Sequence, residues 1–261
     1  ENLYNEIRLN TLFLRDIVFT MKDTLIIVPT FNEIDNIELL LAAIFNRYQE
    51  VHVLVVDDNS PDGTAEKVSC ITNKFPKQLF LLKRLNKQGL GSAYIEGFKW
   101  SLKGSYKYIF EMDADFSHSP KDLEQIYKAC SEDQIDLAIG SRYKGGINVV
   151  NWPLSRILLS YLASWYVRLL TNMPIKDPTA GFVCYKRSVL ESIDLDRVKF
   201  VGYAFQIEMK YKAYNKKFKI KEIPIIFTDR ARGVSKLTKG IIMEAVIGVI
   251  RMRFQQILGK L

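Results

Sequence analysis

The fold of this chain is most constrained by short apolar runs that alternate with amphipathic segments of helical period. Runs of strand length occur at residues 24–29, 51–56, 79–82, 108–112 and 137–139. Each of the first four precedes a helical pattern, and these patterns begin near Asn32, Thr64, Leu90 and Pro120. Strands that are apolar throughout are buried on both faces, so this order predicts an α/β fold with a mostly parallel central sheet flanked by helices.

The second half of the chain departs from this regular alternation. We expect a long apolar helix at about 152–170, a strand at 182–185, a helix at 205–214 and a strand at 220–227. There is no Gly/Ser/Pro-rich or single-sign stretch that would serve as a flexible linker, so one main domain is favoured.

Acidic residues follow three of the predicted strands. Glu33 comes after the first, Asp58 after the second, and Asp113 and Asp115 after the fourth. Ligands of open α/β sheets bind beyond the carboxyl ends of the strands, so we expect these groups near one site. The Asp113–Asp115 pair suits Mg²⁺ or Mn²⁺ bridging a diphosphate, while Glu33 and Asp58 can accept hydrogen bonds from a base or a ribose. A pair of solvated loop acids is the structural alternative.

Basic residues are placed to meet phosphate. Arg142 follows the fifth strand, and the run from Arg230 to Lys236 follows the last one. They either neutralise the acids or bind phosphate. Arg156 and Ser160 are four residues apart and therefore share one face of the 152–170 helix. For His118 we expect a structural role.

The net charge of +8 indicates an anionic partner. The 152–170 helix has a wider apolar surface than an exposed helix usually has, and the segment 236–253 is basic and amphipathic. The 152–170 helix is therefore either a core helix or one that lies on a membrane. Charged residues interrupt both segments, so we expect any membrane contact to be peripheral rather than spanning. The three cysteines form no disulfide or zinc pattern, which fits a reducing cytosol.

Several motifs occur in order along the chain: PTFNE (29–33), VVDDNSPDGT (55–64), GLGSAYIEG (89–97), MDADFSHSP (112–120), GSRYKGG (140–146) and DRARGVSKL (229–237). Together they resemble the dolichyl- or polyprenyl-phosphate mannosyltransferases, which are inverting glycosyltransferases of family 2 with the GT-A fold. The resemblance runs from about residue 22 to residue 237.

The resemblance implies that GDP-mannose donates mannose to a polyprenyl phosphate of the dolichyl type, with Mg²⁺ or Mn²⁺ as cofactor. By similarity, the donor and its metal would be held by Pro29, Phe31, Glu33, Val56, Asp58, Asp113, Ala114, Asp115, Arg230 and Lys236. The acceptor phosphate would be held by Arg142, Arg156 and Ser160. Asp113, Asp115 and Arg142 would form the catalytic centre. Phe31 stands where relatives commonly have Tyr, and Ser117 stands where some have a metal-binding Gln, so Ser117 is a substitute third ligand.

The resemblance also sets the expected organisation and location of the protein. We expect an extension at 1–20, a GT-A catalytic domain at 21–237 that includes the interface helix, and a membrane-interface helix at 238–261. The chain resembles the short form of the family that lacks transmembrane helices, so we expect it to be cytoplasmic and peripheral on the cytosolic face of a membrane.

Other functions explain less of the sequence. A polyprenyl-phosphate glucosyltransferase that uses UDP-glucose is the main alternative. Phosphatases with an aspartyl nucleophile carry DxD after the first strand, not the fourth. A dinucleotide-binding enzyme would need GxGxxG after an early strand, and the chain has none. A nucleic-acid-binding module accounts for the charge but not for the strand-end acids, so we expect no nucleic-acid partner.

Overall fold

The computed structural model describes residues 19–200, 202–229 and 239–259. The first half of the chain alternates strands and helices as the apolar pattern predicts. In chain order the elements are β1 (Phe19–Thr20), β2 (Thr24–Thr30), α2 (Ile34–Arg47), β3 (Tyr48–Gln49), β4 (His52–Asp57), α3 (Thr64–Thr72), β5 (Leu79–Lys83), α4 (Leu90–Leu102), β6 (Tyr108–Glu111), η1 (Pro120–Asp122), α5 (Leu123–Ser131) and β7 (Leu137–Ser141).

The second half contains shorter strands and the longest helices. Its elements are β8 (Val149–Val150), α6 (Leu154–Thr171), β9 (Val183–Lys186), α7 (Arg187–Ser192), η2 (Leu195–Arg197), α8 (Tyr203–Asn215), β10 (Ile220–Pro224), β11 (Phe227–Thr228) and α9 (Lys239–Ile257). The predicted helices at about 152–170 and 205–214 correspond to α6 and α8. Most of residues 1–20 lies outside the described part of the chain.

In the described part of the chain, a seven-stranded sheet has the order β10-β7-β9-β6-β2-β4-β5. Strand β9 is antiparallel to both of its neighbours, β6 and β7, whereas the other neighbouring pairs are parallel. The predicted α/β fold with a mostly parallel sheet is therefore confirmed. The carboxyl ends of β2, β4 and β6 meet at one edge, because β2 pairs with both of the others.

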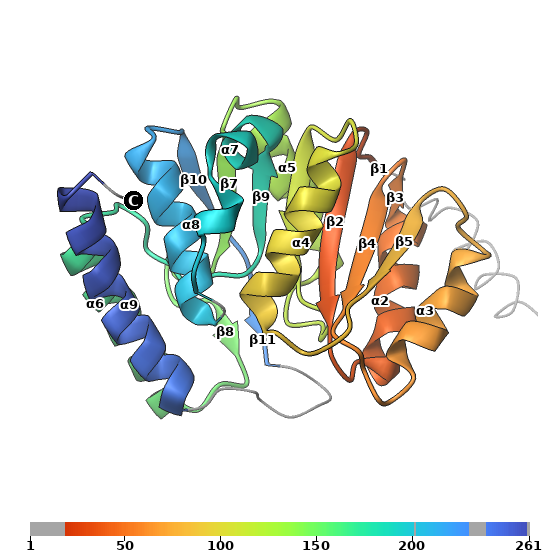
Figure 1. Cartoon of the computed structure of the whole chain (residues 1–261), viewed down its shortest axis with the longest axis horizontal. Helices are drawn as coiled ribbons and strands as arrows, with labels where there is room; N and C mark the ends of the chain where they lie inside the picture. Colours follow the sequence, from red (N-terminus) through yellow and green to blue (C-terminus); the bar gives the residue numbers. More distant parts are fainter. Residues whose placement is uncertain (1–18, 201, 230–238, 260–261) are drawn as a thin grey trace, which may run out of the picture.

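Helices cover both faces of this sheet (Figure 1). Side chains alternate along β2, so that Leu25 and Ile27 belong to the core on the α4 side while Ile26 and Val28 belong to the core on the α2 side. Helix α4 lies close to the sheet at Gly97, where a Cβ atom would come within 2.7 Å of Ile27. A larger residue at 97 would therefore push α4 away from β2.

The predicted strand at 220–227 is wrong in its extent. It is divided into β10, which pairs with β7, and β11, which pairs with β8 in a separate two-stranded sheet. The division follows the bend of the neighbouring chain after β7. The Ile225 amide still donates to the Ser141 carbonyl, but the Phe227 amide donates to the Asn148 carbonyl. The last strand thus leaves the main sheet and reaches the loops at its carboxyl edge.

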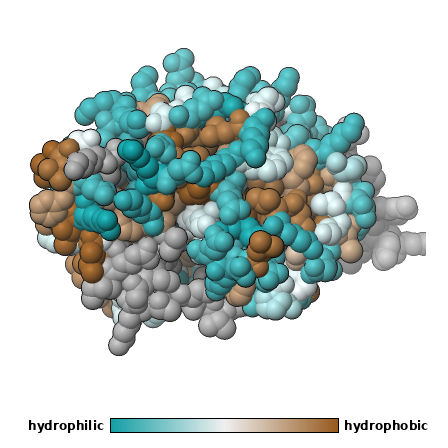
Figure 2. Space-filling model, in the orientation of Figure 1, coloured by the Kyte–Doolittle hydropathy of each residue, from teal (hydrophilic) through white to brown (hydrophobic). Residues whose placement is uncertain are grey.

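Helices α6 and α9 lie side by side, next to α8 (Figure 1). The Tyr166 hydroxyl of α6 donates to the Val246 carbonyl of α9 at 2.9 Å, and Val249 and Met252 of α9 are buried in the core. Many apolar side chains of the two helices are nevertheless more than half exposed, namely Leu154, Leu158, Leu159, Leu162, Trp165, Leu169, Ile247, Phe254 and Ile257. Figure 2 shows apolar side chains at this edge of the molecule. No helix among the described residues is long and apolar enough to cross a membrane.

Candidate functional site

A cavity of about 380 Å³ lies beyond the carboxyl ends of β6 and β7, bordered by α6, α8 and α9. Its polar lining includes Asp113, Asp115 and Ser117 from the loop after β6, Arg142 from the end of β7, and Arg156 and Ser160 from α6, all of them residues singled out in the sequence. Its apolar wall comes from the long helices, with Leu159, Leu162, Tyr166 and Val246. One cavity therefore joins a polar end to an apolar one.

The loop after β6 turns sharply so that its acids and its serine meet. Phe116 has a left-handed backbone (φ 61°), which is uncommon for a residue other than glycine. The turn lets the Ser117 amide donate to Asp115 Oδ1 at 3.1 Å. Asp115 is 7% exposed, whereas the side chain of Asp113 is 34% exposed and accepts a hydrogen bond of 3.4 Å from the Tyr94 hydroxyl.

The donor set of this loop fits Mg²⁺ or Mn²⁺. Ser117 Oγ is buried and has no hydrogen-bond partner among the described residues, and it lines the cavity beside both carboxylates. A buried hydroxyl without a protein partner is rare, and here it leaves an oxygen donor that suits a cation. Among the described residues, no cluster of three or more acidic, His or Cys side chains could hold a metal alone. Mg²⁺ is usually bound by one or two carboxylates together with substrate phosphates, which matches this arrangement.

Arg142 is fixed by an acid that the sequence reasoning did not identify. Its Nε and Nη2 atoms donate to the two carboxylate oxygens of Asp177, at 2.7 and 2.6 Å, and its backbone amide donates to the same carboxylate at 2.9 Å. Thr179 accepts a further bond from Nη2 at 2.7 Å. Glu222 on β10 in turn accepts hydrogen bonds from the Lys176 and Asp177 amides, both at 2.9 Å. The direction in which Arg142 points is therefore set by the 176–179 loop.

Arg156 reaches the same cavity from the first turn of α6. Its Nη1 atom donates to both carboxylate oxygens of Asp229 at 2.9 Å, so it joins α6 to the end of β11. Ser160 lies one turn further along and also lines the cavity. The predicted common face for these two residues is confirmed, and the structure brings Arg142 to the same place.

The residues assigned to the nucleoside lie outside this cavity, at the ends of β2 and β4. Pro29 and Phe31 are partly exposed, and Lys87 Nζ lies 4.0 Å from the centre of the Phe31 ring. Glu33 directly precedes α2 and accepts a hydrogen bond from Asn36 at 2.9 Å. Val56, also assigned to the nucleoside, is buried in the core between β2 and β5. Ala114, assigned with Asp113 and Asp115 to the diphosphate and metal, is buried in the loop after β6, so a ligand would meet the backbone of both residues rather than their side chains.

Asp58 has a buried partner that the sequence reasoning missed. Arg84 Nη1 donates to Asp58 Oδ1 at 2.5 Å, and the same guanidinium binds Glu96, Gln88 and Ser92. Arg84 comes directly after β5. Residues beyond the carboxyl ends of the strands are candidates for ligand binding, and this signal could have identified Arg84. Arg84 fixes Asp58 at the edge where a nucleoside is expected.

The remaining residues singled out in the sequence are Arg230, Lys236 and His118. Arg230 and Lys236 lie outside the described residues. His118 is buried, its Nδ1 accepts a hydrogen bond from the Asp113 amide at 3.3 Å, and its ring stacks on Phe182 at 4.9 Å. Burial lowers the pKa of His118 to about 4, so the ring is neutral at physiological pH. It supports the loop that carries Asp113, as expected for a structural residue.

A buried pair of charged residues lies behind the site. Glu111, the last residue of β6, accepts a hydrogen bond from Gln206 at 2.6 Å, and Lys210 donates to the Ala180 carbonyl at 2.7 Å. Burial raises the pKa of Glu111 to about 7 although the charge of Lys210 opposes the shift, and burial lowers the pKa of Lys210 to about 8. At neutral pH Glu111 is therefore partly protonated, whereas Lys210 remains mostly charged.

This pair leads to a pH-dependent prediction. Between about pH 4.5 and 7 the folded protein keeps a proton on Glu111 that the unfolded chain releases, so the contribution of Glu111 to stability falls as the pH rises through this window. Relative to wild type, Glu111→Gln should gain roughly 2 to 3 kcal/mol between pH 5 and 7.5. The free energy of unfolding of both proteins is measured by urea denaturation at each pH. The difference between them is compared, because the contribution of His118 to stability changes with pH in the opposite direction and is present in both proteins. Exposed Glu132→Gln is the control, and an equal gain there would rule out this assignment.

Comparison with known proteins agrees with these observations. The sequence profile of the family described as "Glycosyl transferase family 2" matches residues 25–194. A polyprenol monophosphomannose synthase of Mycolicibacterium smegmatis is 44% identical over 226 residues, which cover 87% of this chain and 85% of that protein. An undecaprenyl-phosphate mannosyltransferase of Micrococcus luteus is 41% identical over 227 residues, which cover 87% of this chain and 92% of that protein.

Solved structures show the same architecture at low sequence identity. Glucosyl-3-phosphoglycerate synthase from Mycobacterium tuberculosis, in complex with Mn²⁺, UDP and glucosyl-3-phosphoglycerate, superposes with a TM-score of 0.66 at 16% identity, covering 88% of this chain and 79% of that one. At this identity the similarity establishes the fold alone, and it confirms the expected GT-A fold.

Proposed function

We propose that this chain, which belongs to glycosyl transferase family 2 and is a polyprenyl-phosphate mannosyltransferase, transfers mannose from GDP-mannose to a polyprenyl phosphate of the dolichyl type. One observation carries the assignment of the reaction to a site. Carboxylates suited to a divalent cation and arginines suited to a phosphate line the same cavity, which continues between apolar helices. A donor diphosphate would bind there through a divalent cation, and a lipid phosphate would bind the arginines directly.

The chemistry requires no general base. A phosphate monoester has a second pKa of about 6, so the acceptor is already an anionic nucleophile at neutral pH. Its oxygen forms a bond to the anomeric carbon as the bond from that carbon to the nucleoside diphosphate breaks, which inverts the sugar to a β-linked product. Mg²⁺ or Mn²⁺ held by Asp113 and Asp115, with Ser117 as a further oxygen donor, would stabilise the leaving diphosphate as a Lewis acid.

The task of the protein is then to bring two anions together. Arg142, Arg156 and Ser160 hold the acceptor phosphate, and the fixed guanidinium of Arg142 limits where that phosphate can lie. Glu33, Asp58 and Phe31 hold the nucleoside, with Pro29 and Val56 contributing backbone contacts. Ala114 lies with Asp113 and Asp115 at the diphosphate and the metal. Arg230 and Lys236, which lie outside the described residues, are assigned to the donor by similarity. Asp229, which lines the cavity, directly precedes Arg230 in the chain and supports this placement.

The exposed apolar faces of α6 and α9 give the lipid acceptor a route to the cavity. Soluble proteins rarely expose so large a continuous apolar surface, and such surfaces mark sites of interaction. Exposed Arg168 and Arg251 accompany this surface, as expected for helices that bind anionic interfaces. We therefore assign the protein to peripheral attachment at the cytosolic face of a membrane. The free thiols of Cys70, Cys130 and Cys184 fit a reducing compartment.

Membrane attachment can be tested on α6. In flotation with vesicles that contain anionic lipid, Leu158→Glu with Trp165→Glu should weaken binding at least about tenfold, because each exposed apolar side chain contributes roughly 1.5–3 kcal/mol when buried. Wild-type binding should also weaken with salt. Leu39→Glu on α2 is the matched control, since Leu39 is 53% exposed and Leu158 is 54% exposed. Equal binding of all three proteins would remove α6 from the attachment surface.

The reaction itself is tested with a panel of donors. Purified protein is incubated with polyprenyl phosphate, Mg²⁺ or Mn²⁺, and labelled GDP-mannose, GDP-glucose, UDP-glucose or UDP-galactose, and label is extracted into organic solvent. We expect transfer from GDP-mannose and an acid-labile β-linked product. Transfer from UDP-glucose alone would identify the enzyme as a polyprenyl-phosphate glucosyltransferase instead.

A further inference from the structure

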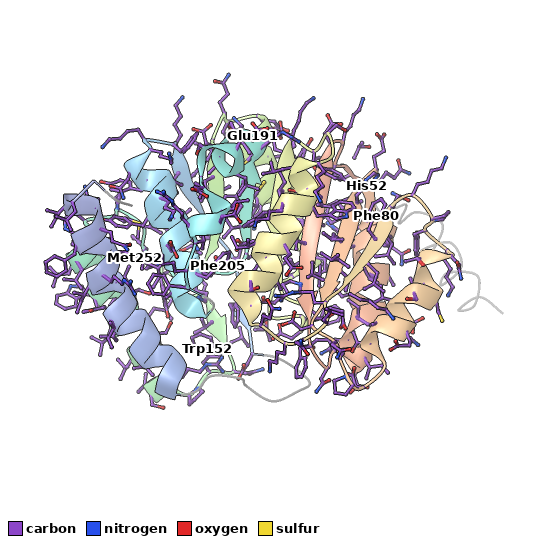
Figure 3. All side chains as sticks on the ribbon, in the orientation of Figure 1. His52, Phe80, Trp152, Glu191, Phe205 and Met252 are labelled. Carbon is purple, nitrogen blue, oxygen red and sulfur yellow. The ribbon has the colours of Figure 1, made fainter. Side chains whose placement is uncertain are left out.

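Trp152 occupies a central position in the cavity that neither the acceptor nor the donor assignment uses. It lies between β8 and α6 and lines the cavity (Figure 3). The Arg156 guanidinium carbon lies 4.1 Å from the centre of its ring, and that of Arg142 lies 5.6 Å from the same ring. Phe227 of β11 meets the ring edge-on at a centroid distance of 5.3 Å. One indole therefore lies against both arginines that face the cavity.

This arrangement lowers the cost of holding two like charges together. Each arginine has its own carboxylate, Asp177 for Arg142 and Asp229 for Arg156. The aromatic face adds an attraction of about 0.5–2 kcal/mol for a guanidinium stacked on it, and it fixes the spacing of the two groups. A phosphate that accepts hydrogen bonds from both arginines needs such a fixed spacing.

The indole N–H of Trp152 offers a donor to a ligand. Trp152 Nε1 is buried and has no hydrogen-bond partner among the described residues. A buried indole N–H nearly always donates to an acceptor, and an unsatisfied one is costly. Arg142 and Arg156, which lie against the ring, carry only donors and cannot accept this hydrogen bond. A phosphate bound between them would supply the missing acceptor oxygen.

We propose that Trp152 is a third recognition group for the phosphate monoester of the acceptor. Its N–H donates to a phosphate oxygen, and its ring holds Arg142 and Arg156 at the spacing that the phosphate requires. This inference rests on the proposed function, because it places the acceptor phosphate rather than the donor diphosphate beside α6.

The direct test observes the N–H in the wild-type protein. In protein labelled with ¹⁵N-tryptophan, farnesyl phosphate should move one indole N–H resonance downfield, and Trp152→Phe should remove that resonance. Farnesol, which has no phosphate, should leave it in place, as should GDP with Mg²⁺. A shift caused by GDP alone would assign the N–H to the donor, and binding of farnesyl phosphate without any indole shift would show that Trp152 does not donate to it.

Kinetics separate the two roles of the ring. Trp152→Phe keeps an aromatic face and loses the N–H, so KM for farnesyl phosphate should rise roughly tenfold while KM for GDP-mannose stays the same. Trp152→Leu should raise it further, and Arg156→Ala is the positive control. Trp100→Phe on α4, whose ring packs against Phe80 and Tyr106 away from the cavity, is the matched control and should leave both constants unchanged. If Trp152→Phe matches wild type while Trp152→Leu fails, the ring is only structural and the proposal is overturned.

The same measurements distinguish this inference from the proposed function. Calorimetry of farnesyl phosphate binding needs no sugar transfer, so a wild-type protein that binds it but transfers no mannose would contradict the function alone. In that case a roughly tenfold weaker affinity in Trp152→Phe would still support the inference, and an unchanged affinity would overturn it. A wild-type protein that does not bind farnesyl phosphate would overturn both.

Discussion

Replacing Asp115 with alanine is expected to abolish mannosyl transfer while the fold survives. Asp115 lies in a loop beyond β6 and is 7% exposed, and its carboxylate contacts the Ser117 amide within the same turn. This contact lies within the loop rather than in the central sheet, so we expect the sheet to keep its structure. It removes one of two carboxylates for the cation, whose stabilisation of the leaving diphosphate amounts to several kcal/mol. We expect the rate to fall by at least about 1,000-fold.

Two measurements separate this role from a loss of structure. GDP binding by calorimetry should depend on Mg²⁺ or Mn²⁺ in the wild type and lose that dependence in Asp115→Ala, while thermal unfolding shifts by only a few degrees. The control is Asp133→Ala, which removes an exposed carboxylate paired with Lys221 and should leave activity unchanged. Full activity of the wild-type enzyme in EDTA would show that no divalent ion takes part.

The sheet was predictable because its strands are buried on both faces. The runs at 24–29, 51–56 and 137–139 are predominantly apolar, as parallel strands buried on both faces usually are. The direction of β9 was not predictable. Its sequence is as apolar as that of the parallel strands, and its reversal depends on the path of the chain from α6 through the 172–182 segment. Periodicity reports burial and carries no information on direction.

The site was predictable where its residues follow strands. Asp113, Asp115 and Arg142 stand directly after β6 and β7, and the structure brings them to one cavity. Arg84 follows β5 in the same way but was not predicted. Its role depends on Asp58, 26 residues earlier in the chain, so the pair is recognised only when both strand ends are considered together.

Other parts of the site left no local pattern in the sequence. Asp177 lies in an irregular segment 35 residues from Arg142, and neither spacing nor periodicity relates the two. Glu111 was counted within an apolar strand, although a carboxylate in such a run is itself a signal, since buried carboxylates need a partner. That partner network includes Lys210 of α8, a helix whose side chains are buried on nearly all sides. Polar residues on α8 therefore do not mark a solvent face.

Asp177→Ala is expected to have the largest effect on stability. Its carboxylate is completely buried and accepts three hydrogen bonds from Arg142, two of them from the guanidinium. Removing one member of a buried ion pair leaves the other charge without compensation, which costs about 3–5 kcal/mol. The freed guanidinium would no longer point in a fixed direction, so KM for the lipid phosphate should rise in the protein that remains folded, whereas donor binding should change little.

The exposed pair of Asp194 and Arg197 provides the matched control. These are the same two residue types, with side chains 57% and 77% exposed, so Asp194→Ala should cost less than about 1 kcal/mol.

The effect of pH gives a second check. Burial alone would raise the pKa of Asp177, but the charge and hydrogen bonds of Arg142 outweigh it and hold the pKa below its ordinary value. The stabilisation is therefore present above the unfolded-state pKa near 3.8 and is lost as the pH falls through the lower pKa of the folded protein. The difference in the free energy of unfolding between Asp177→Ala and wild type should therefore shrink in that acidic range. If this difference were constant with pH, Asp177 would contribute through packing rather than through its charge.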